Sequence, residues 1–254
     1  MKNQLFVILL LFLFSCESLG EETEFLEYDS YVQEAWNAFQ LSDWDTAINL
    51  FNLAINQTSS TNYTDAYSGL GWVYLYKSNN IPGQLNQQSR DLLRENAFSY
   101  FQNANDYIIY NETNLTAHDV LAGLTYIYNY DAEYQIYLYF NDNSFNTNNN
   151  DILESLDLSL STSNSLIEND SEYNFLYDDC VDIDNIRFLR SKIFLNKMNF
   201  SDDPIESYID SLINELNKIT KYSCLDNLEL DELITIDDAI DCLGYLSSEF
   251  NSCQ

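Results

Sequence analysis

Apolar residues recur every three or four positions along residues 28–39 and again along residues 43–55, and no other feature constrains the fold as strongly. This spacing places the apolar side chains on one face of an α-helix. The two runs are interrupted at Leu41, Ser42 and Asp43. Ser42 or Asp43 can cap the second helix by accepting its free backbone N–H groups. The segment is therefore predicted to form a helical hairpin.

Small and aromatic residues follow one another in this hairpin in the order Ala35, Trp44, Ala47, Phe51 and Ala54. The order resembles the tetratricopeptide repeat (TPR). In that family, small residues let the two helices of a hairpin approach closely, and large residues fill the gap to the next hairpin. The resemblance implies that the small residues are buried.

A second repeat unit carries the strongest resemblance to the TPR family. The family's first-helix marker positions are occupied by Tyr67, Leu70, Gly71 and Tyr74. Its second helix needs Ala, an aromatic residue and Ala at spacings of four and three, and these are Ala97, Phe101 and Ala104. They come later in the chain than the repeat requires. We therefore expect either a long hairpin loop or a second helix that begins early, near Ser89.

Two further hairpins and a last helix are predicted after the second unit. The third hairpin pairs residues 116–140 with 151–167 across an Asn-rich loop, and the fourth pairs residues 184–195 with 204–219. Residues 171–177 are aromatic and predict a packed connector, and residues 237–250 predict a capping helix. Only six glycines and two prolines argue against a turn-rich β-sandwich. The resemblance implies an all-α superhelical solenoid of about four hairpins over residues 28–254, with the first helices lining a concave face.

The first fifteen residues are typical of a secretory signal. One lysine precedes an apolar run from Leu5 to Phe14, which is far shorter than the roughly 20 residues that span a bilayer. The run ends in Leu13-Phe14-Ser15-Cys16, which resembles the lipobox of bacterial lipoproteins. The resemblance implies a signal peptide at residues 1–15, lipidation of Cys16, and an acidic tether at residues 16–27. The expected location is the outer membrane, facing the periplasm or the cell surface. An ordinary cleavage site with an incidental cysteine is the alternative.

Acidic residues outnumber basic ones by 41 to 10, which gives a formal net charge of −31. Such a charge repels nucleic acids and anionic lipid surfaces, and no basic stripe offsets it. Nucleic-acid binding is therefore excluded as a function. Basic partners or divalent cations remain compatible with this charge.

Four cysteines follow Cys16, namely Cys180, Cys224, Cys242 and Cys253. In an oxidising envelope they could form two disulfides, while free buried thiols are the alternative. No Cys-x-x-Cys pair is present, so a zinc site is not expected.

No pattern of residues in the chain predicts catalysis. His118 is the single histidine, and it occupies the place that Tyr67 holds in the second repeat, which favours a packing role. Pairs of carboxylates arise by chance among so many acids. Asp178, Asp182 and Asp184 have the alternate spacing of a calcium loop but lack its glycine and closing glutamate. We expect a protein without catalytic residues, cofactor or metal.

Tyrosines are the candidates for partner binding. Tyr126, Tyr130, Tyr134 and Tyr137 share one face of the predicted third-unit helix, and aromatic residues with polar tips are enriched at binding surfaces. The candidate set is completed by Tyr67, Tyr74 and His118. The alternative is that these rings fill the wide seams of a stretched repeat.

Two functions are compatible with this sequence. The first is a non-enzymatic outer-membrane or surface lipoprotein that binds protein partners in a TPR-like groove, as a scaffold or adaptor. The alternative is a surface lipoprotein that binds glycans or nutrients through its tyrosine-rich face.

Overall fold

The computed structural model describes residues 27–57, 63–81, 87–111, 114–141, 148–221 and 234–251. Over these ranges the protein is all-helical, with an isolated antiparallel bridge between Asn174 and Asp182 as its β-structure. The helices are α2 (Tyr28–Gln40), α3 (Trp44–Ile55), α4 (Thr64–Asn79), α5 (Gln87–Asn111), α6 (Asn114–Asn141), α7 (Asn149–Asn169), α8 (Ile183–Phe200), α9 (Ile205–Leu216) and α10 (Ile236–Asn251). The predicted all-α class is confirmed.

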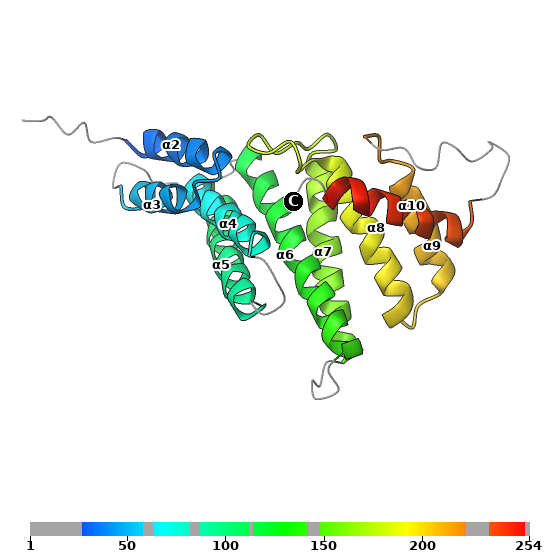
Figure 1. Ribbon diagram of the computed structural model, residues 1–254. Helices are drawn as coiled ribbons and strands as arrows, with labels where there is room; N and C mark the ends of the chain where they lie inside the picture. Colours follow the sequence, from blue (N-terminus) through cyan, green and yellow to red (C-terminus); the bar gives the residue numbers. More distant parts are fainter. Residues whose placement is uncertain are drawn as a thin grey trace, which may run out of the picture.

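The helices pack most extensively in consecutive pairs, which are α2 with α3, α4 with α5, α6 with α7, and α8 with α9. The pairs follow one another in a row, and α10 lies across α8 and α9 (Figure 1). The first helices of neighbouring pairs also touch, because α4 contacts both α2 and α6, and α6 contacts α8. The helix boundaries agree with the predicted ones to within a few residues, and α5 begins early, as one of the two alternatives for the second unit required.

Short polar side chains set where several helices begin. The backbone N–H of Thr46 donates to the Asp43 carboxylate at 3.3 Å, which confirms Asp43 as the cap of α3. Ser42, the other candidate, has a positive φ of 58° and forms the turn instead. Asp182 caps α8 in the same way, since its carboxylate accepts from the N–H of Asn185 at 2.9 Å.

Small residues lie where aromatic rings of the neighbouring helix need space. Ala47 and Ala97 are fully buried and Gly71 is buried, as the repeat pattern predicts. A Cβ atom on Gly71 would lie 2.6 Å from the Phe101 ring, and one on Gly123 would lie 2.2 Å from its Cζ atom. Real Cβ atoms do not come this close, so α4 and α6 can both pack on Phe101 because these positions have no side chain.

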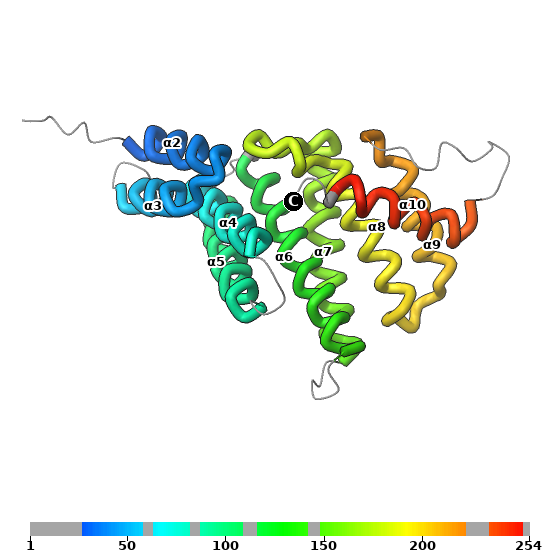
Figure 2. Tube along the Cα trace, in the orientation of Figure 1, coloured from blue at the N-terminus to red at the C-terminus, as the bar shows by residue number. Residues whose placement is uncertain are grey.

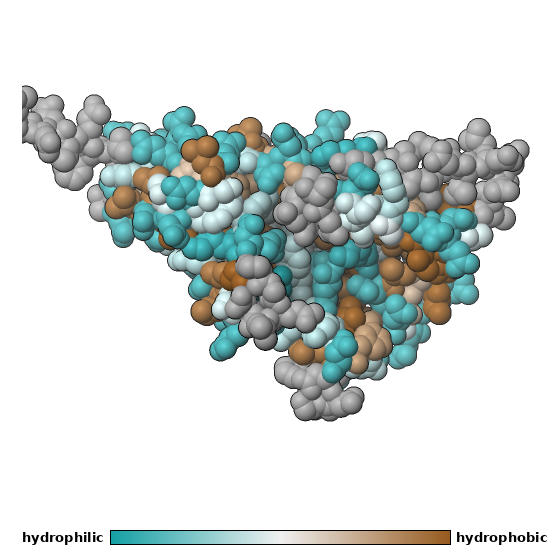
Figure 3. All heavy atoms as spheres, viewed as in Figure 1, coloured by the Kyte–Doolittle hydropathy of each residue, from teal (hydrophilic) through white to brown (hydrophobic). Residues whose placement is uncertain are grey.

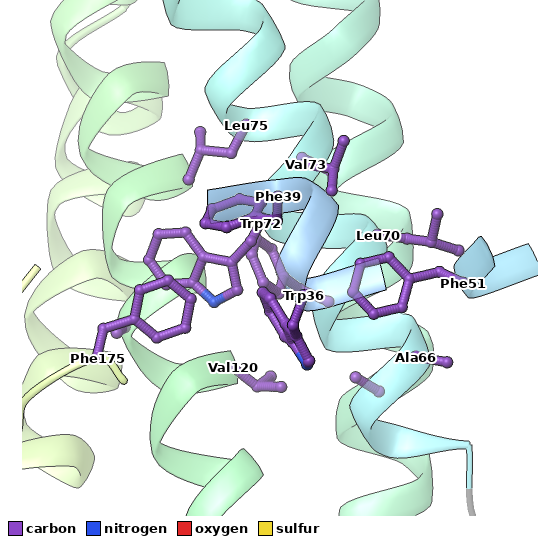
Figure 4. Packing of buried hydrophobic residues seen from close by; sticks show 14 of the residues in the cluster. Trp36, Phe39, Phe51, Ala66, Leu70, Trp72, Val73, Leu75, Val120 and Phe175 are labelled. Atoms are coloured by element: carbon purple, nitrogen blue, oxygen red, sulfur yellow. The ribbon is translucent and has the colours of Figure 1, made fainter. Parts of the chain in front are cut away.

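The segment between α7 and α8, residues 170–182, is a packed connector, as predicted. Figure 2 traces it from the end of α7 over the upper end of α6 and back to α8. Its Phe175 is fully buried and stacks on Trp72 with 4.5 Å between ring centroids (Figure 4). Tyr177 stacks on Trp36 at 3.9 Å. The connector therefore covers the aromatic faces of α2 and α4.

A second hydrophobic cluster joins α8, α9 and α10 and includes Phe188, Leu212 and Phe250. On the face drawn in Figure 3, hydrophilic residues predominate and hydrophobic ones form small separate groups. Among the residues drawn in colour, this face therefore shows no broad apolar area of the kind that stable protein interfaces use.

Candidate functional site

A cavity of about 190 Å³ lies between the first helices, the connector and α10. Five parts of the chain contribute its walls. They include Trp72, Leu75 and Tyr76 of α4, Tyr126, Asn129, Tyr130 and Glu133 of α6, Cys180 and Val181 of the connector, Asn185, Phe188, Leu189 and Lys192 of α8, and Ser247 and Phe250 of α10. Segments far apart in the sequence thus meet at one partly open cavity.

The connector and α10 close this space on two sides. Tyr76 donates a hydrogen bond of 2.5 Å from its hydroxyl to Asp178 of the connector, which holds the connector against α4. The burial of the Tyr76 hydroxyl, together with this carboxylate, holds its pKa well above the ordinary value of 10.0. On the α10 side, the rings of Phe188 and Phe250 lie 4.9 Å apart.

The charged groups among the lining residues neutralise each other. Lys192 of α8 forms an ion pair with Glu133 of α6, and Asn129 donates to the same carboxylate at 3.1 Å. Asn79 donates from its amide nitrogen to the Tyr130 hydroxyl at 3.2 Å. Hydrogen bonds and an ion pair therefore connect polar groups of α4, α6 and α8 at the cavity wall, without an excess of charge.

Three buried polar atoms in the wall have no hydrogen-bond partner among the described residues. They are Nε1 of Trp72, Oδ1 of Asn129 and Oδ1 of Asn185. The three side chains come from α4, α6 and α8 and are 1%, 1% and 5% exposed. A buried polar atom without a partner costs about 1–3 kcal/mol, and each of these three atoms has less than 1 Å² of accessible surface, so each is closed off from solvent.

Two of the seven predicted partner-binding residues line this cavity, namely Tyr126 and Tyr130. Burial raises the pKa of both hydroxyls above the ordinary value, so both are protonated at neutral pH. Tyr67 and Tyr74 lie elsewhere on α4, where their rings stack on Tyr100 of α5 at 6.4 and 5.4 Å. These two rings fill the seam between α4 and α5.

Tyr134 and Tyr137 lie outside the cavity. Tyr134 lines a separate cleft of about 360 Å³ between α5 and α6, where the Arg94 guanidinium lies 4.4 Å above the Tyr130 ring. Tyr137 is 52% exposed. The tyrosines that were predicted to share one helical face are therefore distributed over a cavity, a cleft and open surface.

His118 also lies outside the cavity and helps to hold the connector. Its Nδ1 atom lies 3.1 Å from the Asp170 carboxylate. Beside it, Tyr173 of the connector donates to Asp119 at 3.0 Å. Burial raises the pKa of Asp119 from 3.8 to about 7, against the lowering effect of the Tyr173 hydrogen bond, and the charges of Asp65 and Asp170 raise it further.

The acids of the calcium-like segment are used as hydrogen-bond acceptors. Asp182 caps α8, and Asp184 accepts from the backbone N–H groups of Thr220 and Lys221 at 3.0 and 2.6 Å. Within the part of the chain that the structure describes, no three His, Cys, Asp or Glu side chains are arranged to hold a metal ion.

Cys180 and Cys242 are both disulfide-bonded. Cys224 and Cys253 lie outside the described residues, as do the predicted signal peptide at residues 1–15 and the lipidation site Cys16. Among the helices that the structure describes, none is long and apolar enough to cross a membrane.

Three buried residues that line the cavity are not among the site residues that the sequence predicts. These residues are Trp72, Asn129 and Asn185. The available signal was an amide inside an apolar helical run, because Asn129 interrupts Tyr126-Ile127-Tyr128 and Tyr130. A buried amide in such a run needs a partner.

Neither family models, nor curated protein sequences, nor solved structures match this chain. Over the residues that the structure describes, the protein consists of consecutive helix pairs that line a small polar and aromatic cavity.

Proposed function

We propose that this protein is a non-catalytic binding protein that holds a small polar nutrient molecule in the cavity between α4, α6, α8 and α10. The helix pairs form a TPR-like superhelical solenoid, with α10 as its capping element. Of the two functions compatible with the sequence, this is the second, with the ligand site moved from the tyrosine-rich face to the cavity.

The observation that supports this proposal is that the connector covers the aromatic side chains of α2 and α4. Phe175 and Tyr177 of the connector pack on Trp36 and Trp72, where a TPR-like groove would receive an extended partner. A partly open cavity of about 190 Å³ remains beside them. This space is below the 300–1,000 Å³ of typical drug-sized sites and suits a smaller ligand.

The lining residues favour binding over hydrolysis. A two-carboxylate hydrolase needs a second acid across the site, whereas Glu133 is the one acidic side chain among the described residues of the cavity wall and is paired with Lys192. The anchor is proposed from the sequence alone. Lipidation of Cys16 would hold the binding domain at the outer membrane, and loss of lipid labelling in a Cys16→Ser variant would test it.

The test is a thermal-shift screen of the chain from residue 17 onward against neutral sugars, charged sugars, amino acids and nucleosides. At least one class should raise the melting temperature. A Ser247→Phe variant fills the cavity and should abolish that shift, whereas Ser248→Phe places the same ring at an exposed position of α10 and should retain it. A shift that survives in Ser247→Phe would place the ligand outside the cavity.

A protein-binding scaffold is the second candidate. It is favoured by the serial contacts among the first helices α2, α4, α6 and α8, which is how solenoids present a long continuous surface. Pull-down of the lipidated chain from solubilised membranes tests it, and repeated recovery of no co-purifying protein would contradict it.

A further inference from the structure

We infer that the cleft between α5 and α6 is a second binding site, which takes a free α-amino acid with an apolar side chain and pairs its carboxylate with Arg94. The inference goes beyond the proposed function, because this cleft is separate from the cavity, although Tyr130 lines both. Three observations carry it: an arginine without a countercharge, acids beside that arginine, and a wall of aromatic rings.

The lining side chains of the cleft come from two helices of different pairs. They are Asp91, Arg94, Glu95 and Phe98 of α5, and Ile127, Tyr128, Tyr130, Asp131 and Tyr134 of α6. The spacing of three and four residues places the four side chains of α5 on one helical face. The helices α5 and α6 (Figure 1) pack less extensively on each other than each does on its own partner. The seam between the two pairs therefore stays half-open at this point.

Arg94 is a half-buried cation without a countercharge. Acids outnumber bases by 41 to 10 in this chain, yet the Arg94 guanidinium forms no ion pair or hydrogen bond with any residue that the structure describes. The nearby Asp91 carboxylate accepts from the Gln87 amide instead, at 2.6 Å. Burial lowers the pKa of the guanidinium below its ordinary value. A charge withdrawn from water in this way favours a partner of opposite charge.

The Tyr130 ring holds the guanidinium in place without using its N–H groups. Arg94 lies 4.4 Å above the centre of this ring, and the Tyr130 hydroxyl accepts from Asn79 at 3.2 Å. Nε of Arg94 is closed off from solvent, whereas its two terminal nitrogens are accessible. These terminal N–H groups can donate to an incoming carboxylate, which arginine binds through two parallel hydrogen bonds.

The acids in the cleft favour a ligand that also carries a positive charge. Asp91, Glu95 and Asp131 line the same space, and Glu95 and Asp131 are exposed. Three carboxylates beside one guanidinium repel a ligand whose only charge is negative. An α-ammonium group next to the ligand carboxylate offsets this repulsion. The charges therefore favour an α-amino acid over a simple carboxylic acid.

The aromatic rings favour an apolar side chain on that amino acid. Phe98 and Tyr128 meet edge to face with 5.8 Å between their centroids, and Phe98, Tyr128 and Tyr134 are only partly buried. Ile127 adds an aliphatic group to the wall. An aliphatic or aromatic side chain placed against these rings leaves water, which favours binding.

Isothermal titration of the chain from residue 17 onward with four probes tests the ligand class. L-Phenylalanine should bind, and L-serine should bind at least tenfold more weakly. L-Phenylalaninamide lacks the carboxylate and N-acetyl-L-phenylalanine lacks the ammonium group, and each should also bind at least tenfold more weakly. Equal binding of the N-acetyl derivative would overturn the assignment to a free amino acid, and no binding of L-phenylalanine would overturn the site.

Substitution of Arg94 tests the proposed contact. Arg94→Met should weaken L-phenylalanine binding at least tenfold, whereas Lys218→Met removes a positive charge at an exposed position and should leave binding unchanged. Arg94→Met replaces an unpaired cation by an apolar chain, so the melting temperature of the ligand-free variant should stay the same or rise. If this variant does not fold, Arg94→Lys keeps the charge without the paired donors and should bind more weakly. Unchanged affinity in the Arg94 variant would overturn the inference.

The Ser247→Phe variant separates this inference from the proposed function. L-Phenylalanine binding should survive in Ser247→Phe, because Ser247 lines the cavity and not the cleft. Loss of that binding would place the amino acid in the cavity and overturn the second site. Binding of a sugar or nucleoside in the cavity without any amino acid in the cleft would overturn the inference and leave the proposed function standing.

Discussion

The phenyl ring of Phe175 stacks on the indole of Trp72 with 4.5 Å between their centroids and 26° between their planes. The contact joins the connector to α4, and Phe175 also meets the ring edges of Trp36 and Phe39 of α2. A segment without regular secondary structure thereby becomes part of the main hydrophobic core. Because the same segment supplies Cys180 and Val181 to the cavity, the packing of Phe175 also positions one cavity wall.

Truncation of Phe175 should destabilise the protein and disturb the cavity. Phe175→Ala is expected to lower the free energy of unfolding by about 3–5 kcal/mol, because it removes a fully buried ring and leaves a cavity in the core. Urea denaturation followed by tryptophan fluorescence measures the loss. Leu176→Ala is the control, because Leu176 is 75% exposed and should change stability by less than about 0.5 kcal/mol. Equal losses in the two variants would contradict the connector's place in the core.

A methyl group on Gly123 should cost stability, because a Cβ atom would lie 2.2 Å from Cζ of Phe101. We expect Gly123→Ala to lose about 1–3 kcal/mol through overpacking. Gly244 of α10 has no atom within 4 Å of an added Cβ, so Gly244→Ala should gain about 0.5–1 kcal/mol from helix propensity. Opposite shifts in the denaturation midpoint are the expected result. A gain in both variants would show that α6 does not approach Phe101 this closely.

The helix pairs could be predicted from the sequence because their signals are local. Ala47 and Phe51 are four residues apart in the sequence, as are Ala97 and Phe101, and the period of the helix places each pair on one face, which the structure buries. The packed connector was also predicted, because aromatic residues outside a helix need a hydrophobic environment. Local patterns therefore identified both the elements and the small residues at their seams.

The cavity could not be predicted, because it is assembled from segments with no local relation. Asn129, Asn185 and Ser247 meet only after three helix pairs have packed and α10 has crossed them. The shared helical face of Tyr126 and Tyr137 also proved a poor guide. α6 contacts α4, α5, α7 and α8, so residues along it meet different surroundings.

Neutralising Glu215 should destabilise the folded protein, because Arg187 and Arg190 are both ion-paired with this carboxylate. Glu215 is 4% exposed and accepts hydrogen bonds from Arg187 at 3.2 Å and Arg190 at 3.1 Å. Glu215→Gln leaves both guanidinium groups without their countercharge, and we expect a loss of about 3–5 kcal/mol in urea denaturation. Asp45→Asn breaks the exposed pair with Lys77 and should cause no measurable change. A small effect of Glu215→Gln would mean that water reaches the arginines.

Protonation of Asp119 should couple stability to pH. Burial raises the pKa of Asp119 to about 7 in the folded protein, compared with an ordinary value of 3.8. The folded state therefore keeps its proton between these values, while the unfolded state loses it. The contribution of protonated Asp119 to the free energy of unfolding is fully present below pH 4, declines as pH rises toward 7, and is lost above pH 7. Asp119→Asn cannot ionise, so it should gain stability relative to the natural protein as pH rises.

The quantity to measure is the difference in the free energy of unfolding between the natural protein and Asp119→Asn, because the other carboxyl groups titrate in both. Denaturation midpoints at pH 5, 6, 7 and 8 should show Asp119→Asn gaining on the order of 1–3 kcal/mol relative to the natural protein, with the gain levelling off above pH 7. Asp202→Asn removes the same charge at an exposed position and should keep a constant offset across this range. A constant offset for Asp119→Asn as well would mean that its carboxyl is ionised in the folded protein at pH 5. In that case the Tyr173 hydroxyl, which donates to it at 3.0 Å, outweighs the burial that raises the pKa.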